Sequence, residues 1–108
     1  MSKLKKYKMF IDGEWVDSES KKTFKTLNPE TNEPWAEVPE ANEKDIDKAV
    51  KAAQKAFEGS WPSLFPIERA SYLRAIANEL RENAELLGKI ETIDTGKLFK
   101  ETKNQANY

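Results

Sequence analysis

The segment MFIDGEWV, residues 9–16, decides how the chain begins to fold. Its Asp-Gly pair separates two short apolar runs. Both residues tolerate the positive φ angles of a two-residue primed turn, so the pattern favours a β-hairpin. We therefore predict antiparallel strands over residues 9–11 and 14–16, joined at Asp12 and Gly13.

A second pair of strands is predicted downstream, over residues 23–27 and 34–38. The first alternates weakly in hydropathy, and the polar segment 28–33 between them has the proline and asparagine typical of turns. Because Pro34 and Pro39 bound the later strand, we expect it at a sheet edge.

Helical periodicity begins after Ala41 and continues to the end of the sequence. Asn42 is placed to cap a first helix that ends at Gly59. Its apolar positions form one stripe: Ile46, Ala49, Val50, Ala53, Ala56 and Phe57. A helix is expected to start at Pro66 and to break near Asn83, which would cap the next one.

The third helix is predicted to stop at Asp94–Lys97, and residues 98–108 are expected to be helical. The predicted fold class is therefore α+β, with N-terminal β-hairpins followed by three or four helices. Residues 1–8, which include four lysines, are interpreted as a flexible basic tail rather than an arm for an acidic partner.

Composition narrows the chemistry open to these 108 residues. Cysteine and histidine are both missing, which excludes thiol catalysis, disulfides, Cys/His zinc sites and imidazole acid–base chemistry within them. The net charge of −1 gives no reason to expect nucleic acid or an anionic membrane as a partner. We find no signal peptide or apolar span and expect a cytosolic protein.

Motifs for catalysis or phosphate binding are also missing from the sequence. Paired acids such as Asp45/Asp47 and Glu79/Glu82 lie opposite the apolar stripes and are interpreted as solvated. Trp15, Trp35 and Trp61 are scattered without a basic stripe, so we interpret them as packing residues.

The order of several weak motifs carries more information than any one of them. Phe10–Val16 is followed by Leu27-Asn28-Pro29, a helix ending in Ala56-Phe57, a Trp61-Pro62 turn, Pro66–Arg69, and Glu91–Lys97. In this order they resemble the N-terminal segment of the NAD(P)-dependent aldehyde dehydrogenase superfamily. The resemblance implies that residues 9–108 are an incomplete part of an α/β cofactor-binding domain.

The resemblance also implies what a longer parent protein would do. Family members bind NAD or NADP and oxidise aldehydes through a cysteine thiohemiacetal, hydride transfer and a glutamate-activated water. They form homodimers or homotetramers. Their catalytic and cofactor-binding residues lie beyond this segment, so none is expected here and the chain alone is expected to be inactive.

One site can be carried over from the resemblance. Many members hold a structural monovalent cation through backbone carbonyls, and the matching positions in this sequence are Leu27 and Asp94. A loop and a helix C-terminus both offer carbonyl oxygens to a hard cation. A third ligand would come from sequence downstream.

Two interpretations remain open from the sequence. In the first, the chain is the N-terminal part of an aldehyde dehydrogenase, which predicts a thin core and apolar stripes without partners. In the second, it is a free-standing, non-catalytic interaction module, which predicts a compact core and one exposed apolar patch. Its anchors would be Trp35, Phe57, Trp61 and Phe65.

Overall fold

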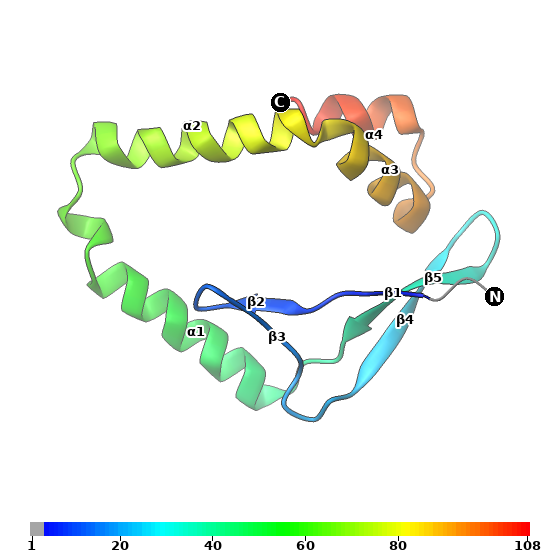
Figure 1. Cartoon of the computed structure of the whole chain (residues 1–108), viewed down its shortest axis with the longest axis horizontal. Coiled ribbons are helices and arrows are strands. Elements are labelled where there is room, and N and C mark those ends of the chain that lie inside the picture. The colour runs from blue at the N-terminus through cyan, green and yellow to red at the C-terminus, as the bar shows by residue number, and fades with distance from the viewer. Residues whose placement is uncertain (1–3) are drawn as a thin grey trace. The chain divides into compact units, whose positions relative to one another are not determined.

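The computed structural model describes residues 4–108, and they form five short strands, four α-helices and one 3₁₀ turn (Figure 1). The chain divides into two compact units. The β-rich unit comprises residues 4–26 and 34–63, and the helical unit comprises residues 27–33 and 64–108. Over the described residues, no helix combines the length and apolar character that crossing a membrane requires.

The predicted first hairpin is confirmed. Strands β2 (Met9–Ile11) and β3 (Glu14–Val16) pair antiparallel, with Phe10 opposite Trp15. Asp12 and Gly13 have φ angles of 52° and 80°, as a primed turn requires. The rings of Phe10 and Trp15 lie 4.9 Å apart between centroids, so this cross-strand pair stabilises the hairpin.

The second sheet corrects one prediction. Its order is β1 (Lys5–Lys6), β5 (Glu33–Pro39) and β4 (Thr23–Asn28), so β5 is central rather than at an edge. The two prolines stand at the ends of β5, where they interrupt little of the hydrogen-bond ladder. Between them, Ala36 and Glu37 pair in parallel with Lys5 and Lys6.

Part of the basic N-terminal segment is ordered against this sheet. Lys5 and Lys6 form β1, and the Tyr7 amide donates a hydrogen bond to the Glu37 carbonyl at 3.0 Å. These residues therefore differ from the expected flexible tail, because the exposed edge of β5 offers them backbone partners. The part of that prediction that concerns residues 1–3 lies outside the described residues.

Helix α1 (Glu43–Glu58) begins and ends where the sequence predicts. Asn42 accepts hydrogen bonds from the amides of Lys44 and Asp45, and the Asp45 carboxylate accepts one from the Asn42 amide. This capping box satisfies amides that a helix start leaves without partners. The short turn η1 (Trp61–Ser63) follows Gly59.

In the helical unit, α2 (Pro66–Glu82) starts at its predicted proline and α3 (Ala84–Thr95) follows the predicted break. Asn83 stands at the N-cap position of α3, as expected, but its side chain makes no capping hydrogen bond to that helix. Its side-chain amide instead donates to the Glu79 carbonyl at 2.9 Å, which closes the C-terminus of α2. Asparagine can serve either end of a helix, and sequence alone did not distinguish them.

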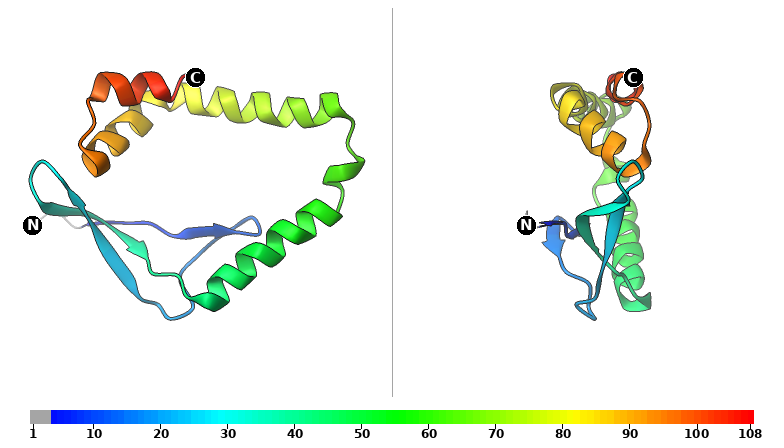
Figure 2. Two further views of the ribbon diagram at one scale, coloured as in Figure 1. Left: turned by 180° about the vertical axis from the view of Figure 1, so that it is seen from behind. Right: turned by 90° about the vertical axis from the view of Figure 1, so that its right-hand side faces the viewer.

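Helix α4 (Phe99–Gln105) confirms the predicted helical tail and packs on α3; Figure 2 shows this pair from two further sides. The contact is close because Gly88 has no side chain. A Cβ there would lie 2.8 Å from the backbone nitrogen of Lys103. The fully buried Thr102 hydroxyl lies 2.9 Å from the Gly88 carbonyl and 3.0 Å from the Thr92 hydroxyl.

The core of the described chain is small. Its buried hydrophobic residues are Ala36 and Ala84, whereas large apolar side chains along α1 and α2 are exposed. On α1 these include Ile46, Val50 and Phe57, which belong to the predicted apolar stripe. The stripe therefore exists, but it has no covering partner within the described residues.

Candidate functional site

The two residues predicted to offer carbonyls to a cation lie in the same unit. Leu27 is near the end of β4, and Asp94 is in the last turn of α3. The structure brings their neighbourhoods together, because a Cβ on Gly96 would lie 3.0 Å from Cγ of Pro29. The turn after Leu27 therefore lies against the residues that follow Asp94.

Local hydrogen bonds shape both segments. The Asn28 side chain accepts from the Glu30 amide at 2.9 Å, and the Asn28 carbonyl accepts from the Asn32 amide at 2.7 Å. Gly96 adopts the left-handed conformation, with φ 75°, and donates its amide to the Thr92 carbonyl. This glycine ends α3 as the sequence predicts and lets Pro29 approach closely.

The donor chemistry of this region fits a carbonyl site better than a carboxylate site. No group of three or more His, Cys, Asp or Glu side chains among residues 4–108 is arranged to hold a metal ion. Backbone carbonyls of a turn and of a helix C-terminus are the oxygen ligands that remain. Leu27 and Asp94 can supply two of them.

A buried carboxylate that the sequence analysis missed lies in the β-rich unit. Asp45 was expected on a solvated face, yet it is only 3% exposed. Besides its bond to Asn42, it accepts the Glu19 amide at 3.0 Å. The signal that could have revealed it is the capping box, in which Asp45 is the third residue after Asn42. The bond to Glu19 could not be predicted, because Glu19 lies 26 residues earlier and no local pattern links the two.

The loop that Asp45 holds also carries an ion pair at the surface. The Lys44 ammonium lies 2.8 Å from the Glu19 carboxylate, which also accepts the Asn42 side-chain amide. The hydrogen bond from Lys44 lowers the pKa of Glu19 below 4.5, and the same bond raises the pKa of Lys44 above 10.5. The pair fixes the loop to the start of α1.

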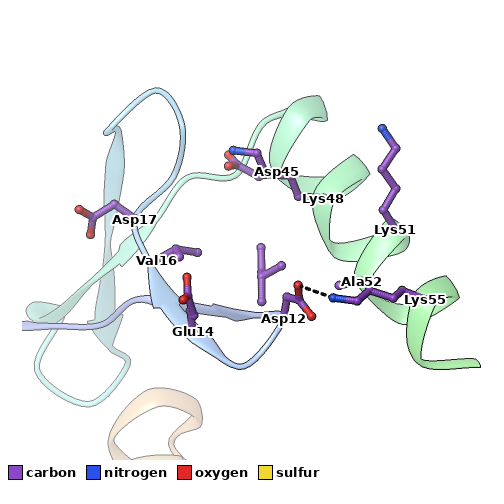
Figure 3. A pocket seen from close by; sticks show the side chains of 10 residues that line it. Asp12, Glu14, Val16, Asp17, Asp45, Lys48, Lys51, Ala52 and Lys55 are labelled. Carbon is purple, nitrogen blue, oxygen red and sulfur yellow. Dashed lines mark hydrogen bonds and ion pairs between the residues drawn. The ribbon is translucent and has the colours of Figure 1, made fainter. Parts of the chain in front are cut away.

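A groove of about 370 Å³ runs between the first hairpin and α1 (Figure 3). Its lining residues include Asp12, Glu14 and Asp17 from the hairpin side and Lys48, Lys51 and Lys55 from α1, and the Asp17 carboxylate points away from α1. The Lys55 ammonium lies 3.4 Å from the Asp12 carboxylate across the groove. Opposite charges therefore hold the hairpin to the helix at its turn.

This groove does not carry the features of a catalytic centre. A nucleophilic lysine is activated by desolvation or by a neighbouring cation. The side chains of Lys51 and Lys55 are 74% and 76% exposed and each pairs with an aspartate. In the described structure both lysines are therefore surface ion-pair partners on α1.

Comparison with known proteins then decides the family. The model of the aldehyde dehydrogenase family matches residues 15–108. The chain belongs to this family. An aldehyde dehydrogenase of Aspergillus niger is 48% identical over 89 residues, which cover 82% of this chain and 18% of that protein.

Solved structures of the family share the fold. The NAD-dependent aldehyde dehydrogenase from Sinorhizobium meliloti matches 97% of this chain and 21% of its own, with a TM-score of 0.92 and 32% identity. The NAD⁺ complex of an aldehyde dehydrogenase from Bacillus cereus matches 93% of this chain and 21% of its own, with a TM-score of 0.88 and 42% identity.

These matches confirm the family resemblance and the α+β fold expected for a segment of the aldehyde dehydrogenase fold. The chain spans about a fifth of the length of the relatives it matches. These residues therefore match only a small part of each relative's structure.

Proposed function

We propose that the chain is the N-terminal part of a longer NAD(P)-dependent aldehyde dehydrogenase, which oxidises an aldehyde to a carboxylic acid. The names of the Sinorhizobium meliloti and Bacillus cereus relatives support NAD as its cofactor, and the family resemblance includes NADP. A cysteine nucleophile has to come from outside these 108 residues, because they contain none.

The observation that carries this proposal is the exposure of apolar helix faces in a chain that matches one fifth of its relatives. On α2, Ile67 and Leu73 are 73% and 64% exposed. Covering one such side chain stabilises a protein by about 1.5–3 kcal/mol. These residues therefore act as a structural element whose helices are completed by the remainder of the enzyme.

The alternative of a free-standing interaction module has weaker support. It predicts a compact core with one apolar patch, whereas the described residues bury only two hydrophobic side chains, Ala36 and Ala84. Exposed apolar residues also extend over several elements rather than one patch: Phe10 and Trp15 on the hairpin, Phe57 on α1, Ile76 on α2, and Leu86 on α3.

Within the longer enzyme, we propose that the Leu27 and Asp94 carbonyls contribute to a monovalent cation site. The approach of Pro29 to Gly96 supports this role, because it brings the two carbonyl-bearing segments together. The cation would tie β4 to the C-terminus of α3. We also propose a cytosolic location, as expected from the sequence, and a homodimer or homotetramer, as the family resemblance implies.

A chimaera tests the proposed function. The matching segment of the Bacillus cereus enzyme is replaced by residues 9–108, and aldehyde-dependent NADH formation is measured. We expect a soluble, active chimaera, because the exposed faces of α1 and α2 would find their partners. The isolated chain is expected to form no NADH.

Two controls make the result specific. A chimaera whose host cysteine nucleophile is replaced by alanine should be inactive, which shows that turnover comes from the host site. A chimaera carrying Ile76→Asp should lose solubility or activity, because a charge would be buried. An insoluble or inactive chimaera beside an active parent enzyme would contradict the proposed function.

A further inference from the structure

The turn of the first hairpin joins an aspartate to a glycine, and no other aspartate of the chain precedes a glycine. The remaining aspartates all precede residues that have side chains: Asp17, Asp45, Asp47 and Asp94. Because glycine has no Cβ, its backbone nitrogen is less shielded than that of any other residue with an amide proton. The Gly13 nitrogen is therefore open to the carboxyl group of the residue before it.

The structure leaves this pair exposed and outside the strand ladder. The ladder of β2 and β3 pairs residues 9–11 with residues 14–16, so neither Asp12 nor Gly13 takes part in it. Both residues are exposed, and a Cβ on Gly13 would have no heavy atom within 4 Å apart from those of its chain neighbours. Exposed turns are also the places where a chain moves most easily. Among the described residues, nothing therefore covers the Gly13 nitrogen.

Three of the other aspartates are held in ways that prevent a similar approach. Asp45 is 3% exposed, and its carboxylate accepts the amides of Glu19 and Asn42. Asp47 and Asp94 lie within α1 and α3, where the helical hydrogen bonds fix the backbone amides that follow them. The chain therefore contains its own references for a reaction confined to the turn.

One contact restrains the Asp12 carboxylate. The Lys55 ammonium on α1 lies 3.4 Å from Oδ2 of Asp12 (Figure 3). A carboxylate in an ion pair is an anion, which has no hydroxyl group to lose as water. Both side chains are more than half exposed, so the ion pair is weak and holds the carboxylate only part of the time.

We propose that Asp12 and Gly13 are a site of spontaneous isoaspartate formation, which the ion pair with Lys55 slows. The Gly13 nitrogen bonds to Cγ of protonated Asp12, the bond from Cγ to its hydroxyl breaks, and that hydroxyl leaves with the amide proton as water. The five-membered succinimide then takes up one solvent water. Opening at Cγ restores aspartate, whereas opening at the main-chain carbonyl carbon of residue 12 gives isoaspartate. Nothing is oxidised or reduced.

Isoaspartate would change the geometry of the hairpin. Its backbone runs through Cβ and Cγ, so the turn gains a carbon atom and no longer sets the register of β2 and β3. The stacked pair of Phe10 and Trp15 depends on that register. The modification would therefore loosen the first hairpin. This inference does not rest on the proposed function, because all reacting atoms belong to this chain and to water.

The test keeps the 108-residue chain in mildly acidic buffer made with water that carries heavy oxygen. Each opening of the succinimide places one solvent oxygen on residue 12, in either product. Trypsin releases residues 9–21 as one peptide that contains both Asp12 and Asp17. Electron-transfer fragmentation locates the heavy oxygen and distinguishes isoaspartate from aspartate. We expect heavy oxygen and isoaspartate to accumulate at residue 12 and not at Asp17.

Matched variants test the role of the ion pair. Lys55→Gln should speed the reaction at residue 12 by about two- to fivefold, as expected for the loss of an exposed ion pair. Lys51→Gln breaks the ion pair with Asp47 on the same helix and should leave the rate unchanged. In urea, where the folded contacts are lost, the parent chain and Lys55→Gln should react at equal rates.

A third variant tests the role of the glycine. Asparagine tolerates the left-handed conformation that Gly13 adopts, so Gly13→Asn keeps the turn but adds a side chain beside the nitrogen. We expect it to lower the reaction at residue 12 to the level at Asp17. Near-ultraviolet circular dichroism of the Phe10 and Trp15 pair reports whether the hairpin is folded. If Gly13→Asn loses this signal, its rate is compared with that of the parent chain in urea.

Three results would overturn the inference. The first is a level of heavy oxygen and isoaspartate at residue 12 that is no higher than at Asp17. The second is an equal rate in folded Lys55→Gln and Lys51→Gln, which would separate the reaction from the ion pair. The third is an undiminished rate in Gly13→Asn, which would show that the open glycine nitrogen does not matter.

Discussion

Helix α2 and the α3–α4 pair belong to the same unit but bury their side chains to opposite extents. The pair buries Ala84, Gly88 and Thr102, whereas α2 contains no buried residue. A short connection after Gly96 returns α4 onto α3, so this contact is made by residues close in sequence. The apolar side chains of α2 find no such neighbour.

This difference in burial separates the contacts that residues of this chain complete by themselves from those that lack a partner within it. Thr102 and Gly88 hold α4 through hydrogen bonds and close backbone packing, and these interactions are complete within the chain. Side chains such as Ile76 on α2 are of the apolar type found in protein cores, but they are exposed to solvent. This contrast is what a segment of a larger domain would show.

The largest effect is expected from Gly88→Val, which would break the α3–α4 contact. A Cβ at this position would lie below 3.0 Å from two backbone atoms of Lys103, and backbone cannot move aside as a side chain does. We expect destabilisation of about 3 kcal/mol, measured by urea unfolding of the chain. Ala75→Val on exposed α2 is the matched control and should change stability by less than about 0.5 kcal/mol.

Equal effects of Gly88→Val and Ala75→Val would contradict the close approach of α4 to α3.

Thr102→Val is expected to have a smaller effect at the same contact. Valine keeps the volume but removes the hydroxyl near the Gly88 carbonyl and the Thr92 hydroxyl. The loss should be about 2 kcal/mol, because buried polar groups lose their partner. Thr95→Val removes an exposed hydroxyl bonded to Glu91 and should have little effect. Faster amide hydrogen exchange in α4 for Thr102→Val only would support this assignment.

Helix α1 combines the two kinds of environment: hydrogen bonds fix its N-terminus to the Glu19 loop, and its apolar face is exposed. Asp45→Ala would remove the carboxylate that accepts the amides of Glu19 and Asn42, and should cost about 1 kcal/mol. Asp47→Ala removes an exposed acid paired with Lys51 on the same helix and should cost less than about 0.5 kcal/mol. The rate of hydrogen exchange at the Glu19 amide measures the loss of its hydrogen bond to Asp45. An unchanged rate in Asp45→Ala would contradict this hydrogen bond.

On the bare face of α2, Ile76→Ser should change the stability of the isolated chain by less than about 0.5 kcal/mol. Ile76 is 57% exposed, so little buried apolar area is lost. In the chimaera with the Bacillus cereus enzyme, the same substitution should cost about 2 kcal/mol or more. Thermal unfolding of both proteins provides the measurement, and equal effects in the two contexts would be inconsistent with a face that becomes covered.

The smallest effect concerns the surface pair of Glu19 and Lys44. The pKa of Glu19 is lowered in the folded state by its bond to Lys44, so the stability it contributes is present above pH 4.5. That stability is lost as the pH falls through the folded-state pKa of Glu19. The difference in stability between the parent chain and Glu19→Gln should therefore be present at pH 7 and vanish in acid. A difference that persists in acid would assign it to another cause.

Local signals in the sequence predicted much of this fold because their partners are close in sequence. The Asp12–Gly13 turn, the Asn42 cap and the end of α3 at Gly96 each depend on neighbours within a few residues. The central place of β5 could not be predicted, since it depends on Lys5 and Lys6 arriving from the start of the chain.

The sites show the same limit. Asp45 is buried because the Glu19 loop folds onto it, and no helical periodicity contains that information. Lys5 and Lys6 likewise pair with Ala36 and Glu37 about thirty positions later, and because a local pattern does not contain this pairing, residues 1–8 were interpreted as a flexible tail. For Leu27 and Asp94, the family resemblance rather than any local pattern selected the positions.

Amide hydrogen exchange of α2, compared between the 108-residue chain and the Bacillus cereus chimaera, tests the central claim most directly. The claim is that the exposed faces of this chain are covered by the remainder of a longer enzyme. We predict that protection of the α2 amides rises at least tenfold in the chimaera, while α3–α4 changes much less. Equal protection of α2 in both proteins would contradict the claim.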